Sequence, residues 1–315
     1  MFKKIKSLLL VTLVTGASVV GCAKTTVEDD MYRVTLVMDE GGVNDQSFNQ
    51  SAWEGALRAE EKYNVDVHYI ESNQEGDYMP NIENAIDLDS DLVVGVGFKI
   101  TDAIKDAAES YPEQKFAIID GTYDEIPSNV QSIMFNEEQA GYAAGLVAAK
   151  TTDTGVVGFV GGMDIPSCSN FLVGFEKAIK EEDANIKVLS QYANSFTDAA
   201  KGKIISEQMI MNNADIIFMA SGGGNVGVIE AVRENNIKAI GVDMPSNYIA
   251  PEHIITSALK NVGTGLELTI KDLVNGEFEG GKVKLYDLSN GGVGFEKTDL
   301  LDEELIEYVE EKLNN

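Results

Sequence analysis

Polar side chains that could hold a small ligand recur where short apolar runs of this sequence end. The run 34–38 ends in Asp39, and the loop after it carries Asn44, Phe48 and Asn49. Ligands of open α/β sheets bind just outside the carboxyl ends of the strands. Carboxylates and amides beside one aromatic ring suit a flat molecule that bears hydroxyl groups. This loop is therefore the first candidate for a binding site.

The same loop also has a purely structural interpretation. Asp45 and Ser47 both favour the cap position of a helix, and a helical pattern with Ala52, Trp53 and Ala56 follows them. A turn between a strand and a helix would have this composition without binding anything. From this stretch alone, both interpretations stay open.

Residues that could contact a ligand also follow later apolar runs of the chain. They are acidic, basic, aromatic and glycine residues, which together can bond hydroxyl groups and let a ligand approach the backbone closely. They are Asp120 after the run 116–119, Phe196 in the loop after 186–190, Gly222 after 216–220, Asp243 after 239–242 and Lys260 after 254–259.

The elements that must position these residues alternate between strand-like and helix-like patterns in two consecutive series. The first series covers residues 33–151, and the second covers residues 152–259. This alternation predicts an α/β fold of two lobes, each with a parallel sheet and helices on both faces. Two further segments, about 260–285 and about 286–315, are expected to return to the first and the second lobe. The predicted site lies in the cleft between the lobes.

The amino terminus has the pattern of an export signal. A basic start with three lysines precedes an apolar segment, 7–20, that is too short for a bilayer, because a spanning helix needs roughly 20 apolar residues. The segment leads into Val-Val-Gly-Cys22, which resembles the lipobox of bacterial lipoproteins. The resemblance implies a signal peptide of residues 1–21, a lipidated Cys22 thiol and a polar tether of residues 22–32. We therefore expect a protein outside the cytoplasm that acyl chains hold at the cell membrane.

Charge and composition exclude several classes of function. The formal net charge is −28, which opposes general affinity for nucleic acid or anionic lipid and fits a soluble monomer. Only two cysteines and two histidines are present, and they form no zinc motif, Ser-His-Asp order or Cys-His pair. No metal is therefore expected. With Cys22 lipidated, Cys168 has no disulfide partner and is interpreted as a small packed residue.

One glycine pattern supports a competing hypothesis. Gly222, Gly224 and Gly227 satisfy G-x-G-x-x-G between a predicted strand and a predicted helix, and Asp243 follows about twenty residues later. Local rules therefore allow an NAD-dependent enzyme. The pattern lies deep in the chain, however, and an exported protein meets little NAD. Glycines that permit a tight turn and close helix packing explain the same pattern.

Taken in order, the motifs resemble those of the basic membrane protein family. These are substrate-binding lipoproteins of ABC importers, and they include purine nucleoside receptors. The resemblance covers nearly the whole mature chain. Its marks are Asp39 with Asn44-Asp45-x-Ser47-Phe48-Asn49, Asp120-Gly121, Glu138-x-x-Gly141-Tyr142-x-x-Gly145, Gly161-Gly162-Met163 with Pro166, Phe171, Gly174 and Phe175, Phe196-x-Asp198, Gly222-Gly223, Gly241-Val242-Asp243 and Ser257-x-Leu259-Lys260.

The resemblance implies a type I periplasmic-binding fold with two Rossmann-like lobes and a hinged ligand cleft. It implies a binding protein, not an enzyme, that needs no cofactor and delivers its ligand to an ABC permease and its ATPase. Inosine, guanosine and adenosine are the ligands it suggests. A binding protein for a sugar or another small polar ligand, and a signalling or adhesion lipoprotein, remain alternatives because one fold serves many ligands.

The resemblance also implies roles for individual residues. In nucleoside-binding members, aromatic rings from both lobes sandwich the purine, which here would be Phe48 and Phe196. An aspartate bonds the base edge, which would be Asp39 with Asn44 or Asn49 nearby. The ribose would be held by Asp120, Asp243 and Lys260, with backbone at Gly222.

Two features of the sequence qualify these roles. Relatives usually carry Gly-Gly-Thr-Gly where this chain has Gly-Gly-Gly-Asn at 222–225, so the contacts to ribose are the least certain part of the assignment. A site with at least three aspartates and one lysine repels a phosphate group. The sequence therefore predicts a preference for nucleosides over nucleotides.

Overall fold

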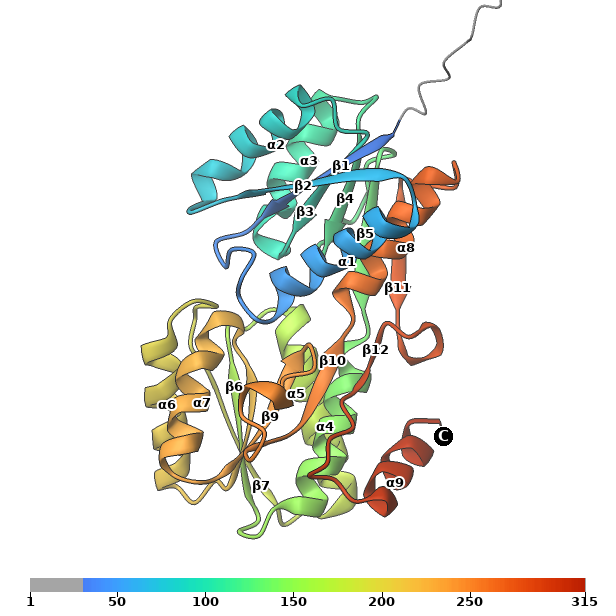
Figure 1. Cartoon of the computed structure of the whole chain (residues 1–315). Coiled ribbons are helices and arrows are strands. Elements are labelled where there is room, and N and C mark those ends of the chain that lie inside the picture. Colours follow the sequence, from blue (N-terminus) through green and yellow to red (C-terminus); the bar gives the residue numbers. More distant parts are fainter. Residues whose placement is uncertain (1–30, 315) are drawn as a thin grey trace, which may run out of the picture. The chain divides into compact units, whose positions relative to one another are not determined.

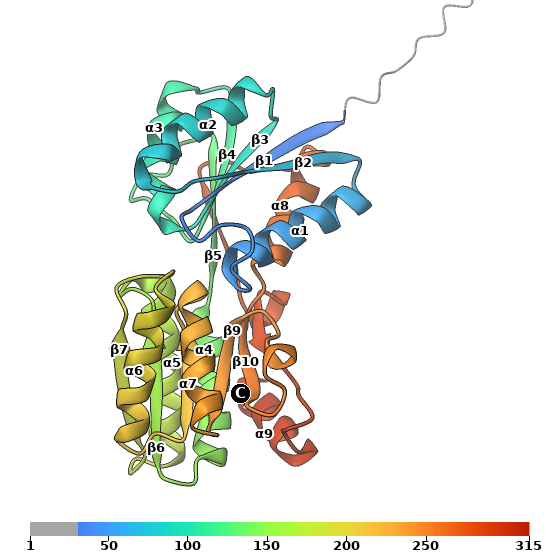
Figure 2. The same ribbon diagram turned by 60° about the vertical axis from the view of Figure 1, so that its left-hand side comes forward.

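The computed structural model describes residues 31–314. Within that part of the chain, two six-stranded sheets each carry their own helices (Figures 1 and 2). We call the two halves lobe 1 and lobe 2. The signal peptide, Cys22 and most of the tether predicted from the sequence lie outside the described residues.

Lobe 1 is built on a fully parallel sheet with the strand order β11-β5-β4-β3-β1-β2. Its central strand β3 is buried along its whole length, as expected for a strand that helices cover on both faces. Helices α1 and α8 pack together, as do α2 and α3. The elements are β1 (Tyr32–Met38), α1 (Phe48–Lys62), β2 (Val65–Glu71), α2 (Tyr78–Asp87), β3 (Leu92–Val96), α3 (Thr101–Ser110), β4 (Lys115–Ile119), β5 (Val130–Phe135), α8 (Val262–Val274) and β11 (Lys282–Tyr286).

Lobe 2 repeats this arrangement with the strand order β12-β10-β9-β8-β6-β7. Its strands are parallel except for the short edge strand β12, which runs antiparallel to β10. The elements are α4 (Glu137–Thr151), β6 (Val156–Gly161), α5 (Pro166–Glu182), β7 (Lys187–Tyr192), α6 (Ala199–Met211), β8 (Ile216–Ala220), α7 (Asn225–Glu234), β9 (Lys238–Asp243), β10 (Ile254–Lys260), β12 (Val293–Phe295) and α9 (Glu303–Asn314).

Helix α4 packs on the lobe that follows it, whereas the sequence analysis counted residues up to 151 with the first lobe. It contacts α5, β10, β12 and α9, all of lobe 2. Small residues of α4 let it pack closely on lobe 2. A Cβ on Gly141 would lie only 2.1 Å from the Phe171 carbonyl oxygen of α5. Only glycine permits that approach between the helix backbones. The chain therefore enters lobe 2 after β5, about 15 residues earlier than expected.

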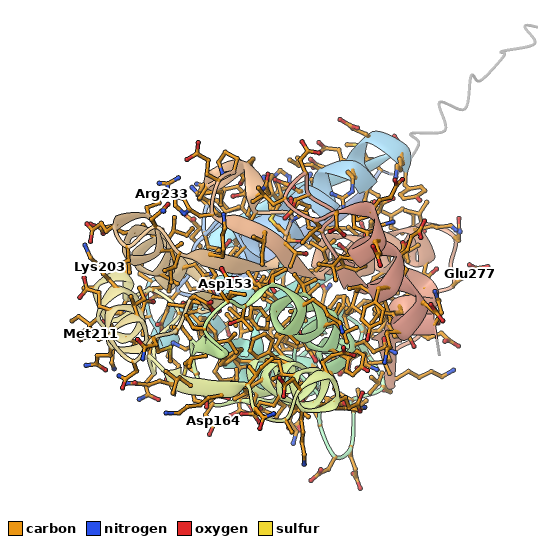
Figure 3. The ribbon with its side chains drawn as sticks, turned by 90° about the horizontal axis from the view of Figure 1, so that it is seen from below. Asp153, Asp164, Lys203, Met211, Arg233 and Glu277 are labelled. Atoms are coloured by element: carbon orange, nitrogen blue, oxygen red, sulfur yellow. The ribbon has the colours of Figure 1, made fainter. Side chains whose placement is uncertain are left out.

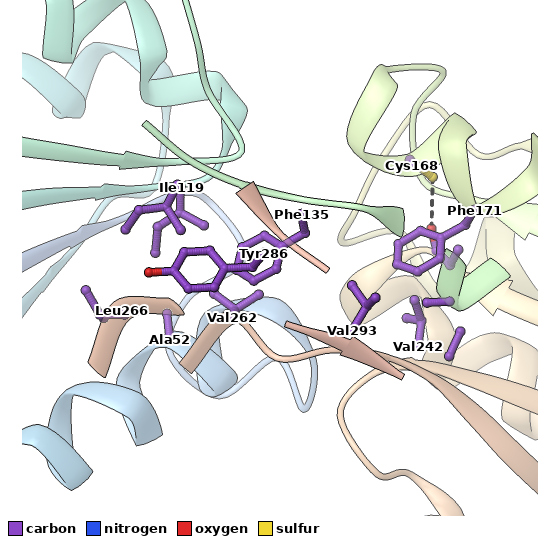
Figure 4. Close-up of a cluster of buried hydrophobic side chains, with 14 of the residues drawn as sticks. Ala52, Ile119, Phe135, Cys168, Phe171, Val242, Val262, Leu266, Tyr286 and Val293 are labelled. Atoms are coloured by element: carbon purple, nitrogen blue, oxygen red, sulfur yellow. Dashed lines mark hydrogen bonds between the residues drawn. The ribbon is translucent and has the colours of Figure 1, made fainter. Parts of the chain in front are cut away.

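The chain crosses between the lobes at three places, β5 to α4, β10 to α8 and β11 to β12. The crossings are bonded to one another: the Asn136 amide donates to the Tyr286 carbonyl at 2.9 Å, and the Asn261 amide donates to the Gly292 carbonyl at 2.8 Å. The Phe135 and Tyr286 rings stack beside them with centroids 5.6 Å apart (Figure 4). These contacts make the crossings one connected structure.

Charged side chains surround the two lobes and point outwards, as the labelled Asp153, Lys203 and Glu277 show (Figure 3). Some are paired: the Lys203 ammonium lies 2.8 Å from Glu230 and 3.0 Å from Glu234. In the described part of the chain, no helix combines the length and the apolar character needed to cross a bilayer.

Candidate ligand-binding site

One pocket collects the carboxyl ends of strands from both sheets. It encloses about 620 Å³ of space free of protein atoms, counting the part open to solvent, which is within the range of ligand pockets. Lobe 1 contributes Asp39, Gly41, Asp45, Phe48, Asn49, Gly97, Phe98 and Asp120, and lobe 2 contributes Ile165, Ser167, Cys168, Phe171, Phe196, Ala220, Gly222, Val242, Asp243 and Lys260.

Asp39 and Asn49 form a polar pair at the end of β1. One Asp39 carboxylate oxygen accepts from the Gly41 amide at 2.9 Å and from Asn49 Nδ2 at 2.8 Å. Asn49 Oδ1 is buried and has no hydrogen-bond partner among the described residues. Burial raises the pKa of Asp39, and the bonds from Asn49 and Gly41 oppose that rise. The pair thus offers unused acceptors to a ligand that carries N–H groups.

Asp45 caps helix α1 next to this pair. Its carboxylate accepts from the backbone amides of Ser47 at 2.9 Å, Asn49 at 2.9 Å and Gln50 at 3.0 Å. Burial raises the pKa of Asp45 to about 6, although the three amides oppose the rise. The two interpretations of this loop are therefore compatible, since Asp45 caps the helix while Phe48 and Asn49 line the pocket.

Four phenylalanines line the pocket, and the sequence analysis named two of them, Phe48 and Phe196, as ligand contacts. Phe48 comes from α1 of lobe 1, and Phe196 comes from the loop between β7 and α6 of lobe 2. Phe98, which follows β3, was missed and meets Phe196 edge to face at 6.4 Å between ring centroids. Phe196 lies so close to Gly162 that a Cβ there would be 2.2 Å from the ring.

Lys260 is the centre of a buried charged group that we call the Lys260 cluster, made of Lys260, Asp120, Glu137 and Asp243. Its ammonium lies 2.5 Å from Asp120 Oδ2 and 2.8 Å from Glu137 Oε1. Asp243 accepts a short hydrogen bond from the Ser47 hydroxyl. Asp120 Oδ1 is buried without a hydrogen-bond partner among the described residues.

The cluster holds more negative than positive groups, and their pKa values reflect this. Burial raises the pKa of Asp120 and of Asp243, and Lys260 opposes both shifts. Burial disfavours the charge of Lys260, but its three acidic neighbours outweigh burial and raise its pKa. The lysine is therefore held as a cation, and the acids retain acceptor capacity for hydroxyl groups.

Eight of the nine ligand-contact residues predicted from the sequence line this pocket. The exception is Asn44, which is exposed on the loop before α1 and does not line it. The sequence analysis left Asn44 and Asn49 as alternatives beside Asp39, and the structure brings Asn49 there. Residues of the site that the analysis did not predict as ligand contacts include Asp45, which it named only as a cap and a family mark, Phe98 and Glu137. Only the position of Gly97 and Phe98 directly after a buried strand could have signalled one of them.

Cys168 forms part of the pocket wall. Its Sγ donates to the Ala220 carbonyl at 3.4 Å, the contact that Figure 4 marks beside Phe171. Burial raises the pKa of the thiol to about 12, so the thiolate is disfavoured. This agrees with its interpretation as a small packed residue.

The amides at the end of the glycine turn 222–224, where a pyrophosphate would have to bind, are already bonded within the protein. The Gly224 amide donates to the carbonyls of Phe196 and Ser221, and the Asn225 amide donates to Gly222 and Gly223. The Phe196 loop therefore covers the turn that the NAD hypothesis requires. Asp243, the acidic residue of that hypothesis, belongs instead to the Lys260 cluster.

Two α/β lobes joined by three crossings, with a ligand-sized pocket at their facing strand ends, define a solute-binding protein of the type I periplasmic-binding fold. Solved structures agree. A solute-binding protein of an ABC transporter system from Aeropyrum pernix K1 is 32% identical with a TM-score of 0.79, over 90% of this chain and 80% of that chain. An arabinose-binding protein from Geobacillus stearothermophilus shares the fold, with 18% identity and a TM-score of 0.64 over 85% and 97%.

The family follows from sequence comparison. Residues 33–315 match the family model described as ABC transporter substrate-binding protein PnrA-like, and the chain belongs to that family. Basic membrane protein A of Borreliella burgdorferi is 35% identical over 294 residues, or 91% of this chain and 86% of the relative. The ABC transporter nucleoside-binding protein BmpA of Lactococcus lactis subsp. cremoris is 33% identical over 321 residues, or 93% and 91%.

Membership confirms the family resemblance and the fold predicted from the sequence. The protein is a substrate-binding protein of an ABC transporter, a class that binds its ligand outside the cytoplasm and is not a class of enzymes.

Proposed function

We propose that this protein captures purine nucleosides in the pocket between its lobes and delivers them to the permease and ATPase of an ABC importer. The observation that carries the proposal is the composition of the pocket. Phe48 and Phe196 line it from opposite lobes, beside the acceptors of Asp39 and Asn49 and the Lys260 cluster. A purine nucleoside combines a flat base, N–H groups on its edge and a vicinal diol.

Each part of such a ligand has suitable partners in the pocket. Stacking of one base on an aromatic side chain contributes roughly 1–3 kcal/mol. A carboxylate such as Asp39 accepts N–H bonds that are stronger than neutral ones. The free oxygen of Asp120 can accept a hydroxyl, and Lys260 can donate to its oxygen atoms. The nucleoside-binding name of the Lactococcus relative supports the same ligand class.

The charge of the pocket supports nucleosides over nucleotides. Asp120, Glu137 and Asp243 surround the single ammonium of Lys260, and Asp39 and Asp45 add further carboxylates. A phosphate group would add negative charge beside buried acids and would find one lysine, already paired, to neutralise it. We therefore expect inosine, guanosine and adenosine to bind and their monophosphates to bind much more weakly.

The export pattern of the amino terminus supports the location of this function. We infer that the protein is lipidated on Cys22 and acts as a monomer on the outer side of the cell membrane. Growth with radioactive palmitate should label the mature protein, and Cys22→Ala should abolish the label. An unlabelled mature wild type would rule out the anchor without affecting the proposed ligand.

A ligand panel tests the proposed function directly. Thermal unfolding of the purified protein is measured with nucleosides, free bases, ribose, other sugars, nucleoside monophosphates and NADH, and every ligand that raises the Tm is titrated by calorimetry. Stabilisation by purine nucleosides alone is expected, because a ligand that binds only the folded state raises the Tm. Stabilisation by sugars without nucleosides would identify a sugar-binding protein instead, and binding of NADH would revive the dinucleotide hypothesis.

A further inference from the structure

Glu137 is a buried acid whose side chain lies beside Lys260 and not at the protein surface. It is 2% exposed, begins helix α4 and follows directly on the crossing from β5. Its Oε1 lies 2.8 Å from the Lys260 ammonium, and its Oε2 accepts from Asn170 Nδ2 at 3.4 Å. Oε1 is not aligned as a hydrogen-bond acceptor. Glu137 therefore acts on Lys260 as a fixed negative charge.

The two acids beside Lys260 belong to different lobes. Lys260 ends β10 and Glu137 begins α4, and these two elements pack together in lobe 2. Asp120 follows β4 of lobe 1 and accepts the directed hydrogen bond of the lysine at 2.5 Å. The Glu137 pair is thus internal to one lobe, while the Asp120 pair spans the two. If the lobes move apart about their crossings, only the Glu137 pair can persist.

Two aromatic rings also contact the Lys260 ammonium. The ammonium lies 5.4 Å from the centroid of Phe48 and 5.4 Å from that of Phe135, distances at which a cation is attracted to a ring. Phe135 is the last residue of β5 and stacks on Tyr286, the last residue of β11 (Figure 4). Phe135 therefore links the surroundings of the Lys260 ammonium to the segments that connect the lobes.

We propose that Glu137 is a positioning residue that holds the Lys260 ammonium on lobe 2, so that ligand hydroxyls and Asp120 meet an already fixed cation. The inference rests on the proposed nucleoside function. Without Glu137, Asp120 is the one acid left within ion-pair distance of the lysine among the described residues. The ammonium is then held only from lobe 1, by the carboxylate whose free oxygen is available to ligand hydroxyls, and is no longer fixed on lobe 2. Glu137 thus acts on the ligand through Lys260 and not by contact.

The test compares one ligand with and without its vicinal 2′- and 3′-hydroxyl groups. Kd values are measured by calorimetry for inosine and 2′,3′-dideoxyinosine with wild type, Glu137→Gln and Glu138→Gln. Glu138 is the matched control, because it is the adjacent residue of the same helix, is half exposed and pairs with Lys177. We expect Glu137→Gln to weaken inosine by about tenfold and the dideoxy analogue by less than about twofold. Glu138→Gln should change neither.

Two further variants separate positioning from folding. In a Lys260→Gln background, Glu137→Gln should have little additional effect on inosine, because the residue acts through the lysine. Glu137→Asp, which keeps the charge, should restore part of the lost affinity. If Glu137→Gln is too unstable to purify, the same ligand pair is measured with Glu137→Asp, whose loss should again fall on inosine alone.

The outcomes separate the role of Glu137 from the nucleoside-binding function on which it rests. An equal loss of affinity for both ligands would show that Glu137 only maintains the fold, and unchanged binding of both would show that it has no role. Either result overturns the inference and leaves the nucleoside function intact. A wild type that binds neither ligand overturns the proposed function and the inference with it.

Discussion

The ends of β4 and β9 are equivalent positions in the two lobes, yet they are bonded in different ways. Each strand occupies the third place from the edge of its sheet, and each leads into an aspartate with a left-handed backbone, Asp120 at φ 62° and Asp243 at φ 63°. Asp120 is bound by a charged lysine of lobe 2, and Asp243 by a neutral hydroxyl of lobe 1. Repetition of the fold thus places the acids symmetrically, and their partners make the two sides different.

Both bonds join one lobe to the other. The Lys260–Asp120 pair links residues 140 positions apart, and Ser47 and Asp243 are 196 positions apart. Removing the charged link should therefore cost more than changing the neutral one. The following changes test this asymmetry in order of expected effect.

Lys260→Ala is expected to have the largest effect. It leaves three buried acids without their cation, and breaking a buried ion pair in this way costs about 3–5 kcal/mol of folding stability. Nucleoside binding should be lost as well. Urea unfolding and calorimetry measure the two effects. The matched change is Lys203→Ala, which removes a lysine between two acids on the surface and should alter neither quantity appreciably. Equal effects of the two changes would contradict a special role for the buried cluster.

The aromatic rings extend the comparison between lobes. Phe48→Ala and Phe196→Ala each remove one ring from the pocket and should each weaken nucleoside binding by at least about tenfold, since one stack contributes roughly 1–3 kcal/mol. Similar losses of affinity in the two variants would show that both lobes contact the base. Calorimetry with guanosine measures both variants, and Phe98→Ala tests whether the Phe98 ring acts by supporting Phe196. Unchanged affinity in both single variants would remove the sandwich.

Asp120→Asn and Asp243→Asn test the asymmetry directly. Asp120→Asn leaves Lys260 with a neutral amide oxygen in place of a carboxylate and should weaken inosine by about tenfold, because hydrogen bonds between charged groups are the stronger ones, at about 1.5–3 kcal/mol. Asp243→Asn keeps an oxygen that can still accept from Ser47, so a loss of about threefold is expected. A larger loss for Asp243→Asn would reverse the ranking of the two lobes.

The smallest expected effect is on the pH dependence of stability. Burial raises the pKa of Asp39, Asp45 and Asp120 in lobe 1 and of Asp243 in lobe 2, with Asp45 at about 6. Such acids bind a proton more tightly in the folded state than in the unfolded state, where an aspartate has a pKa of about 3.9. The free energy of unfolding of the ligand-free protein should therefore rise as the pH falls from 7 towards 5.

Urea unfolding across this range measures the slope. Asp45→Asn should reduce the rise by on the order of 1 kcal/mol, because it removes the acid whose raised pKa lies in the middle of the range. A slope of the opposite sign in the wild type would contradict the raised pKa of the buried aspartates, because acids with a lowered pKa, such as Asp66 and Glu182, lose their contribution to stability only below about pH 5.

Much of the site could be read from the sequence because strand ends are local features. Apolar runs that stop at Asp39, Asp120 and Asp243 predict both the strands and the acids at their carboxyl ends. The family resemblance added the prediction that Phe48 and Phe196 sandwich a base, and both residues line the pocket. Whether these residues bind a nucleoside remains the prediction that the ligand panel tests.

Other parts of the site depend on contacts between distant segments. Asn44 and Asn49 lie in one short stretch, and only the start of α1 decides that Asn49 reaches Asp39. Glu137 follows an apolar run like many surface acids, and nothing in its neighbours reveals a lysine more than a hundred residues away.

By itself, the sequence determined the order of strands and helices, the polar strand ends and the family, because these depend on local periodicity and on motifs in a fixed order. The tertiary structure alone decided that α4 packs on lobe 2, that Asn49 and not Asn44 lines the pocket, and that Lys260 lies between acids of both lobes. The physical reason is that burial, close helix approach and ion pairing join segments whose spacing along the chain carries no trace of the contact.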